Sequence, residues 1–192
     1  MRGSLLYPPL SLVALLLLVP GGMAQADHCS EEIEASGKPD AELAGVGILV
    51  GAVLKATEHL GSPTSLEIYP DPEYPGSGER QYSWGRRFER VVVATMFAPP
   101  DARVGPETPY SVELFQDVGR AGSPARRLAT SRGVTLGAPR SKVIAKYGQR
   151  FLEETIEGRQ ILSYCWMNDT WLSFEFDSEG FVSHIQLLGS VE

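Results

Sequence analysis

The fold is decided by two stretches that share one pattern, GAVLKATEHLG at residues 51–61 and GAPRSKVIAKYG at residues 137–148. Each follows a short apolar run, at 48–50 in the first case and at 134–136 in the second. Each also ends in a glycine, which readily takes the left-handed conformation that commonly follows the last turn of a helix. We therefore expect two short helices that end at Gly61 and Gly148.

Strands are expected downstream of both helices. A Tyr-x-Trp motif follows each helix, at 82–84 and at 164–166, and an apolar strand follows each motif, at 91–93 and at 172–174. An internal repeat constrains the architecture more strongly than any single element, and a helix must bury its apolar stripe against another layer. We predict an α+β fold of two tandem repeats of a helix packed on an antiparallel sheet, at residues 46–117 and 133–192.

The second copy carries a longer pattern of glycines, aromatic residues and aliphatic residues. Its members are Gly133, Leu136, Gly137, Ser141, Lys142, Val143, Tyr147, Gly148, Tyr164, Trp166, Leu172, Phe174, Phe176, Asp177, Gly180, Val182 and Ile185. This pattern resembles one repeat of the β-lactamase inhibitor protein fold, and it also resembles the small outer-membrane assembly lipoproteins of Gram-negative bacteria. Two tandem copies resemble the inhibitor more closely. By analogy of fold, the resemblance implies a scaffold that binds other proteins through the open face of its sheet.

The N-terminus has the pattern of a secretory signal. A basic residue, Arg2, precedes the apolar run 10–19, and a small-x-small cleavage site follows at 24–26. The run is too short to favour a membrane-spanning helix. We therefore assign residues 1–26 to a signal peptide and 27–45 to an N-terminal arm, which makes the protein periplasmic or secreted without a membrane span. The alternative is an uncleaved N-terminal anchor.

Two cysteines, Cys29 and Cys165, remain after the predicted cleavage. Export places them in an oxidising compartment, where a pair usually closes. We expect a structural disulfide between the arm and the second repeat. The alternative is a reactive thiol, but no histidine adjoins Cys165 in the sequence.

Charge is distributed unevenly along an acidic chain, whose formal net charge is −7. This charge disfavours nucleic acid as a partner, because phosphates repel it. Residues 118–152 contain no acid and carry the basic residues Arg120, Arg126, Arg127, Arg132, Arg140, Lys142, Lys146 and Arg150. We interpret 118–132 as a basic junction whose Arg126, Arg127 and Arg132 attract an acidic partner or anionic headgroups. The alternative is a solvated surface that balances neighbouring acids.

Alternation in the strand at 171–176 separates two faces. Leu172 and Phe174 share the face that a helix should cover, whereas Trp171 points to the open face. A large exposed aromatic is a typical anchor for a protein partner, so we propose Trp171 as a binding residue. The alternative is that the N-terminal arm or the first repeat covers it.

No catalytic constellation stands out. The three histidines, His28, His59 and His184, lack a second ligand at metal-binding spacing and are expected to be isolated and solvated, and no nucleophile elbow or phosphate-binding glycine loop appears. We therefore expect no catalytic residue, metal or cofactor. The sequence favours an exported non-catalytic module that binds another protein, such as an inhibitor or a periplasmic interaction protein. The alternatives are a structural component of the bacterial cell envelope or outer-membrane assembly, and an enzyme of unknown type. The oligomeric state stays open.

Overall fold

The computed structural model describes Cys29, Ala35, Gly37, Pro39 and residues 42–47, 52–86, 89–97, 108–116, 128–166 and 170–189. The predicted signal peptide, most of the N-terminal arm and most of the basic junction lie outside the described residues. Within the described part of the chain, no helix combines the length and the apolar character needed to cross a membrane.

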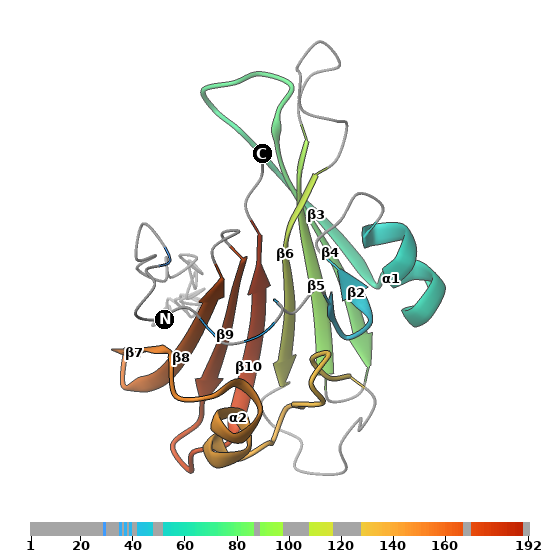
Figure 1. The fold of residues 1–192 in the computed structure, drawn as a ribbon. Coiled ribbons are helices and arrows are strands. Elements are labelled where there is room, and N and C mark those ends of the chain that lie inside the picture. The colour runs from blue at the N-terminus through green and yellow to red at the C-terminus, as the bar shows by residue number, and fades with distance from the viewer. Residues whose placement is uncertain are drawn as a thin grey trace, which may run out of the picture.

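One large antiparallel sheet dominates the structure (Figure 1). Its eight strands lie in the order β3-β4-β5-β6-β10-β9-β8-β7. Their bounds are β3 Ser65–Pro70, β4 Gly78–Arg86, β5 Glu89–Phe97, β6 Thr108–Gln116, β7 Leu152–Ile156, β8 Arg159–Trp166, β9 Thr170–Phe176 and β10 Val182–Leu188. A second, two-stranded sheet pairs β1 (Glu42–Leu43) with β2 (Val46–Gly47), and the helices are α1 (Ala52–Leu60) and α2 (Arg140–Tyr147).

The predicted fold class is wrong. We expected an α+β protein of two tandem units of helix and sheet. Over the described residues, the structure is instead a β-rich fold with one large continuous sheet and two helices of only 9 and 8 residues. The sheet is continuous because β6 and β10 pair at its centre, where Leu114 lies opposite Ile185 and Val112 opposite Leu187. This pairing satisfies backbone groups that two separate sheets would have left exposed at their edges.

Both helices and the β1–β2 hairpin cover the same face of the sheet. Leu43, Val46 and Ala56 are fully buried in one cluster with the sheet residues on this face. On α2, Tyr147 packs its ring 5.1 Å from the ring of Tyr164 and 5.2 Å from that of Phe174, measured between centroids. Figure 1 shows α2 and β2 in front of the sheet. We call this side the covered face and the other side the open face.

The two helices end as their glycines predict. Gly61 has a φ of 87°, and its N–H donates to the carbonyl oxygen of Thr57. Gly148 has a φ of 93°, and its N–H donates to the carbonyl oxygen of Ile144 at 2.8 Å. The indole N–H of Trp84 donates to the Gly61 carbonyl at 2.7 Å, which fixes the end of α1 to β4.

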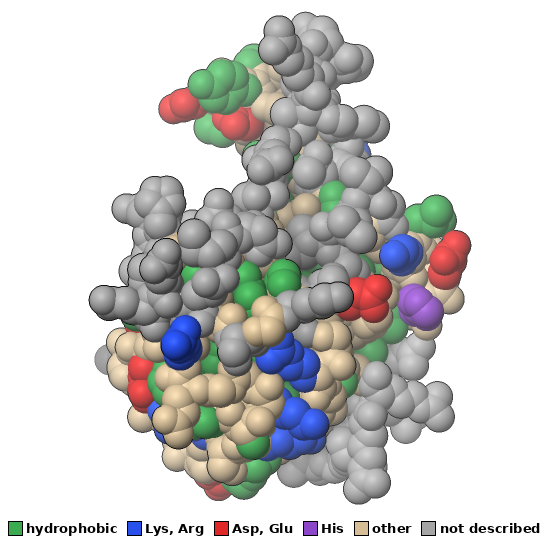
Figure 2. All heavy atoms as spheres, viewed as in Figure 1, with side chains coloured by type: hydrophobic (Ala, Val, Ile, Leu, Met, Phe, Trp, Pro, Cys, Tyr) green, Lys and Arg blue, Asp and Glu red, His purple; other side chains and the backbone are tan. Residues whose placement is uncertain are grey.

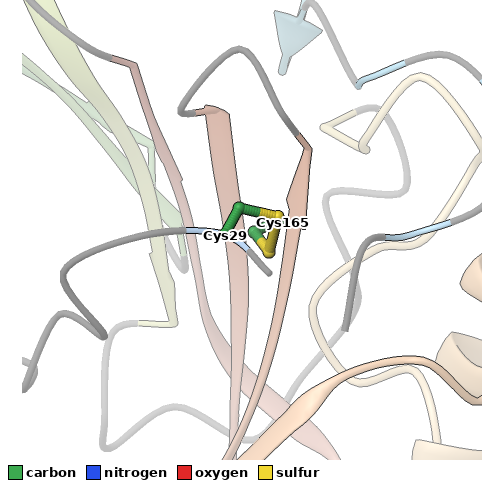
Figure 3. The surroundings of a disulfide bond; sticks show 2 residues. All are labelled: Cys29 and Cys165. Carbon is green, nitrogen blue, oxygen red and sulfur yellow. A yellow bond between two sulfur atoms is a disulfide. The ribbon is translucent and has the colours of Figure 1, made fainter. Parts of the chain in front are cut away.

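The predicted disulfide is confirmed. Cys29 of the arm is bonded to Cys165 of β8 across 136 residues of sequence (Figure 3). Trp171 and Leu188 pack against this bond. The N–H of Ala35 donates to the carbonyl oxygen of Cys165 at 2.9 Å, and Ala35 itself lies in the cluster on the covered face. The described arm residues therefore run past β8 from the open face to the covered face.

Candidate protein-binding face

The open face of the sheet carries a row of charged and aromatic side chains from four adjacent central strands. The row comprises Arg90 of β5, Phe115 of β6, His184 of β10 and Glu175 of β9, which are neighbours in the strand registers. Each is at least partly exposed. We call these four residues the central row. Because successive side chains along a strand point to opposite faces, the neighbouring apolar residues Leu114, Ile185 and Phe174 point into the core on the covered face.

His184 lies between two carboxylates. Its Nε2 is 3.2 Å from Oε2 of Glu113, and its Nδ1 is 3.6 Å from Oε2 of Glu175. Burial of the imidazole alone would lower the pKa of His184, but the hydrogen bonds and charges of the two carboxylates outweigh it and raise the pKa above its ordinary value. The two carboxylates therefore favour the charged form of His184, and each ring nitrogen faces one of them.

The two carboxylates are held in their charged form. Burial would raise the pKa of Glu113, but hydrogen bonds from His184, Ser111 and Gln186 and the charge of His184 lower it. The hydrogen bond from His184 is the largest cause that lowers the pKa of Glu175, and Arg159 adds to it through a 2.6 Å ion pair. Both carboxylates thus have cationic or hydrogen-bonding partners within the protein, and such a paired network favours a rigid surface over one that rearranges on binding.

Phe115 stacks on His184, and the exposed Arg90 lies over Phe115. The rings of Phe115 and His184 lie parallel, with 4.2 Å between centroids and 9° between planes. The Arg90 guanidinium lies 5.3 Å from the centroid of Phe115, within the range of a cation–π contact. Arg90 is exposed. The stack therefore presents a cation and an aromatic ring, which together suit an acidic or aromatic side chain of a partner.

Small side chains flank the central row. Ser83 of β4, Ala94 of β5, Ser111 of β6 and Ser173 of β9 lie on the open face, and all four are buried. The hydroxyl groups of Ser163 and Ser173 lie 2.8 Å apart and form a hydrogen bond across β8 and β9. Among the described residues, Cys29 of the arm packs against this face beside Trp171. These short side chains are therefore shielded from solvent, whereas the residues of the central row are at least partly exposed.

Trp171 lies on the open face, as alternation predicts, but it is only 8% exposed. It packs with the Cys29–Cys165 disulfide and Leu188. The alternative interpretation of the sequence, that the arm covers this tryptophan, matches this placement. Its part in binding stays a prediction.

Arg132 lies on the other side of the sheet. Its guanidinium is 4.8 Å from the centroid of Tyr147, and its Nη1 donates to the carbonyl oxygen of Lys146 at 3.2 Å. These contacts place Arg132 at the end of α2, against the covered face. The structure does not bring it together with Trp171. Arg126 and Arg127, the other two predicted binding residues, lie outside the described residues.

Basic side chains gather over α2 on the covered side of the molecule (Figure 2). Lys142 and Lys146 are exposed on the helix, and Arg150 is exposed just beyond it. Arg140 is instead paired with Glu153 at 2.9 Å. We call Lys142, Lys146 and Arg150 the α2 basic surface.

Sequence reasoning missed the central row. The expectation that His184 is isolated and solvated is wrong, because it contacts Glu113 and Glu175. Alternation along each strand could have shown part of it, since Glu113 and Phe115 share one face of their strand and His184 and Gln186 share one face of theirs. The sequence pattern does not predict that these two strands pair with each other. Among the described residues, no group of three histidine, cysteine or acidic side chains is placed to hold a metal ion.

No family model, no curated protein and no solved structure matches the chain.

Proposed function

We propose that this protein is an exported, non-catalytic module that binds another protein through the open face of its sheet. The observation that carries the proposal is the central row, which lies on a face that no described helix covers. The resemblance of the sequence to the β-lactamase inhibitor protein fold supports the same interpretation. The disulfide is consistent with export, because such bonds persist in oxidising compartments.

The physical argument rests on preorganisation. Aromatic residues and arginine dominate the binding energy of many protein interfaces. Here Phe115 stacks on a paired histidine in the middle of the sheet, and Arg90 lies over the ring of Phe115. Side chains that are already ordered lose little conformational entropy when a partner binds. The central row therefore offers anchors at low entropic cost.

The charges at the two ends of the central row favour an acidic partner. The carboxylates of Glu113 and Glu175 are engaged with His184 and are mostly buried, with side-chain exposures of 20% and 12%. Arg159, beyond Glu175 on β8, is 65% exposed, and Arg90 at the other end of the row is exposed. A partner that approaches the row thus meets arginine at both ends, and complementary charge speeds association.

Site-specific photocrosslinking tests this proposal. A photoreactive amino acid is introduced at position 115 on the open face and, as a matched control, at position 142 on the α2 basic surface. Both versions are made in cells that naturally produce the protein, and the crosslinked products are identified by mass spectrometry.

We expect the probe at position 115 to capture a discrete protein, and we expect addition of unlabelled wild-type protein to compete that product away. Capture from position 142 with none from position 115 would move the interface to α2 and overturn the proposal.

A further inference from the structure

Among the described residues, strand β3 forms one edge of the sheet and pairs with β4 alone. All six of its residues are exposed, whereas the residues of the opposite edge strand, β7, alternate between partly buried and exposed. Along an edge strand, alternate backbone N–H and C=O groups face away from the neighbouring strand and have no partner in the sheet. β3 therefore presents a row of free backbone donors and acceptors.

The side chains of β3 are unusual for an exposed edge because they are largely apolar. Leu66 and Ile68, which share a face with Tyr82 and Arg80 of β4, are 48% and 53% exposed. Tyr69, on the open-face side, is 48% exposed. Edge strands are usually protected by several charges or prolines, but β3 has only Glu67 within it and Pro70 at its end. The face of β3 that carries Leu66 and Ile68 therefore favours a ligand with apolar side chains.

The open-face side of β3 is acidic. Glu67 lies opposite Gln81 in the register, and Glu79 lies opposite Tyr69, two residues further along each strand. Glu67 accepts a hydrogen bond from the Tyr69 hydroxyl, and Glu79 accepts one from the side chain of Gln81. Within the part of the chain that the structure describes, neither carboxylate has an ion-pair partner. This side favours a ligand that brings cations.

The hairpin that carries β3 is a defined structure. The Asp71 carboxylate accepts hydrogen bonds from the N–H groups of Glu73 and Tyr74 in the turn. Gly78 starts β4 with a φ of 151°, and a Cβ there would collide with the carbonyl oxygen of Tyr69. Figure 2 shows hydrophobic and acidic side chains together at the tip of this hairpin. These contacts define the turn that joins β3 to β4.

We propose that β3 binds an extended segment of a partner protein by strand addition, and that apolar and basic residues alternate in this segment. Its apolar residues pack beside Leu66 and Ile68, and its basic residues lie beside Glu67. A second copy of this chain fits less well, because pairing two β3 strands brings two acidic hairpins together, and β7 carries Glu153 and Glu154. This docking edge is separate from the central row and does not depend on it.

Binding of a designed peptide tests the proposal. The probe is a fluorescent peptide as long as β3 in which valine and lysine alternate, titrated with the full mature protein and followed by fluorescence anisotropy. One comparison peptide has the same composition with its lysines in a block, and another has alternate backbone nitrogens methylated. The variant Glu67→Lys is compared with Glu154→Lys, which makes the same charge change on the opposite edge strand.

We expect the alternating peptide to bind more tightly than both comparison peptides. Glu67→Lys should weaken its binding about tenfold, since a cross-strand attraction becomes a repulsion, and Glu154→Lys should leave it unchanged. Equal binding of the methylated or block peptide, equal effects of the two variants, or no binding at all would overturn the proposal. Circular dichroism of both variants confirms that the fold is kept.

Discussion

Replacing His184 by glutamine removes the cation between two carboxylates of the open face. His184 Nε2 lies 3.2 Å from Glu113, and its Nδ1 lies 3.6 Å from Glu175. The side chain of His184 is 12% exposed, so water replaces little of the lost interaction. The glutamine amide still donates a hydrogen bond to one carboxylate, and Arg159 still faces the other.

The expected cost follows from the burial of these groups. Removal of one member of a buried ion pair typically lowers the free energy of unfolding by about 3–5 kcal/mol. We expect about 3 kcal/mol for His184→Gln, the lower end, because Arg159 and the amide compensate in part. For a chain of this size, about 2–4 °C of melting temperature accompanies each kcal/mol. The melting temperature should therefore fall by about 6–12 °C near pH 6.

The effect of the substitution should depend on pH. Because its folded-state pKa is raised, the contribution of His184 is complete below its unfolded pKa of 6.5 and fades as the pH rises through the folded pKa. The pKa values of Glu113 and Glu175 are lowered, so their contribution is complete above 4.5 and fades as the pH falls through the folded values. The network is therefore most stabilising between pH 4.5 and 6.5.

Urea unfolding of the wild type and of His184→Gln, measured between about pH 5 and about pH 9, checks this prediction. The difference in stability should be largest near pH 6 and should decline toward alkaline pH. The control is His59→Gln, since His59 is exposed on α1 and forms no ion pair with the described residues. A difference that stays constant or grows from pH 6 to pH 9 would refute the charged state of His184.

Three further substitutions test the packing. Val143 is fully buried on α2, so Val143→Asp should cost several kcal/mol and abolish the cooperative melt in circular dichroism; an unchanged melt would show that the helix face is misassigned. Removing the disulfide with Cys29→Ala and Cys165→Ser should lower the free energy of unfolding by about 2–5 kcal/mol in urea, and unchanged stability would contradict a structural role. Trp171→Ala should cost about 3–5 kcal/mol, seen as a lower melting temperature; a wild-type melt with weakened partner binding would instead make Trp171 an anchor.

Local features of the fold were predictable from the sequence. Gly61 and Gly148 marked the helix ends, and the alternation at 171–176 assigned Leu172 and Phe174 to the covered face. The disulfide followed from the presence of two cysteines in a chain with an export signal pattern. Each of these inferences uses neighbours in sequence or a simple count. The pairing of β6 with β10 depends on which strand edges meet, and no local pattern specifies that, so the predicted fold class was wrong.

The candidate site was harder to predict for the same reason. His184 and Glu113 are 71 residues apart and meet only because β6 and β10 pair. The burial of Trp171 depends on the position of Cys29 in the arm, which periodicity within a strand does not report. Arg132 was assigned to partner binding from charge alone, but its contacts with Tyr147 and Lys146 hold it on the covered side. Long-range contacts thus decide the site.

The affinity of Phe115→Ala for the captured partner tests the central claim most directly. If the central row is the binding surface, this substitution should weaken binding by about 2 kcal/mol or more, about 30-fold, the scale of an interface hot spot. The control is Leu54→Ala, which removes an apolar side chain that is 64% exposed on α1. We predict a large loss for Phe115→Ala, wild-type affinity for Leu54→Ala, and unchanged circular dichroism for both. Wild-type affinity of Phe115→Ala would contradict the assignment of the open face as the binding surface.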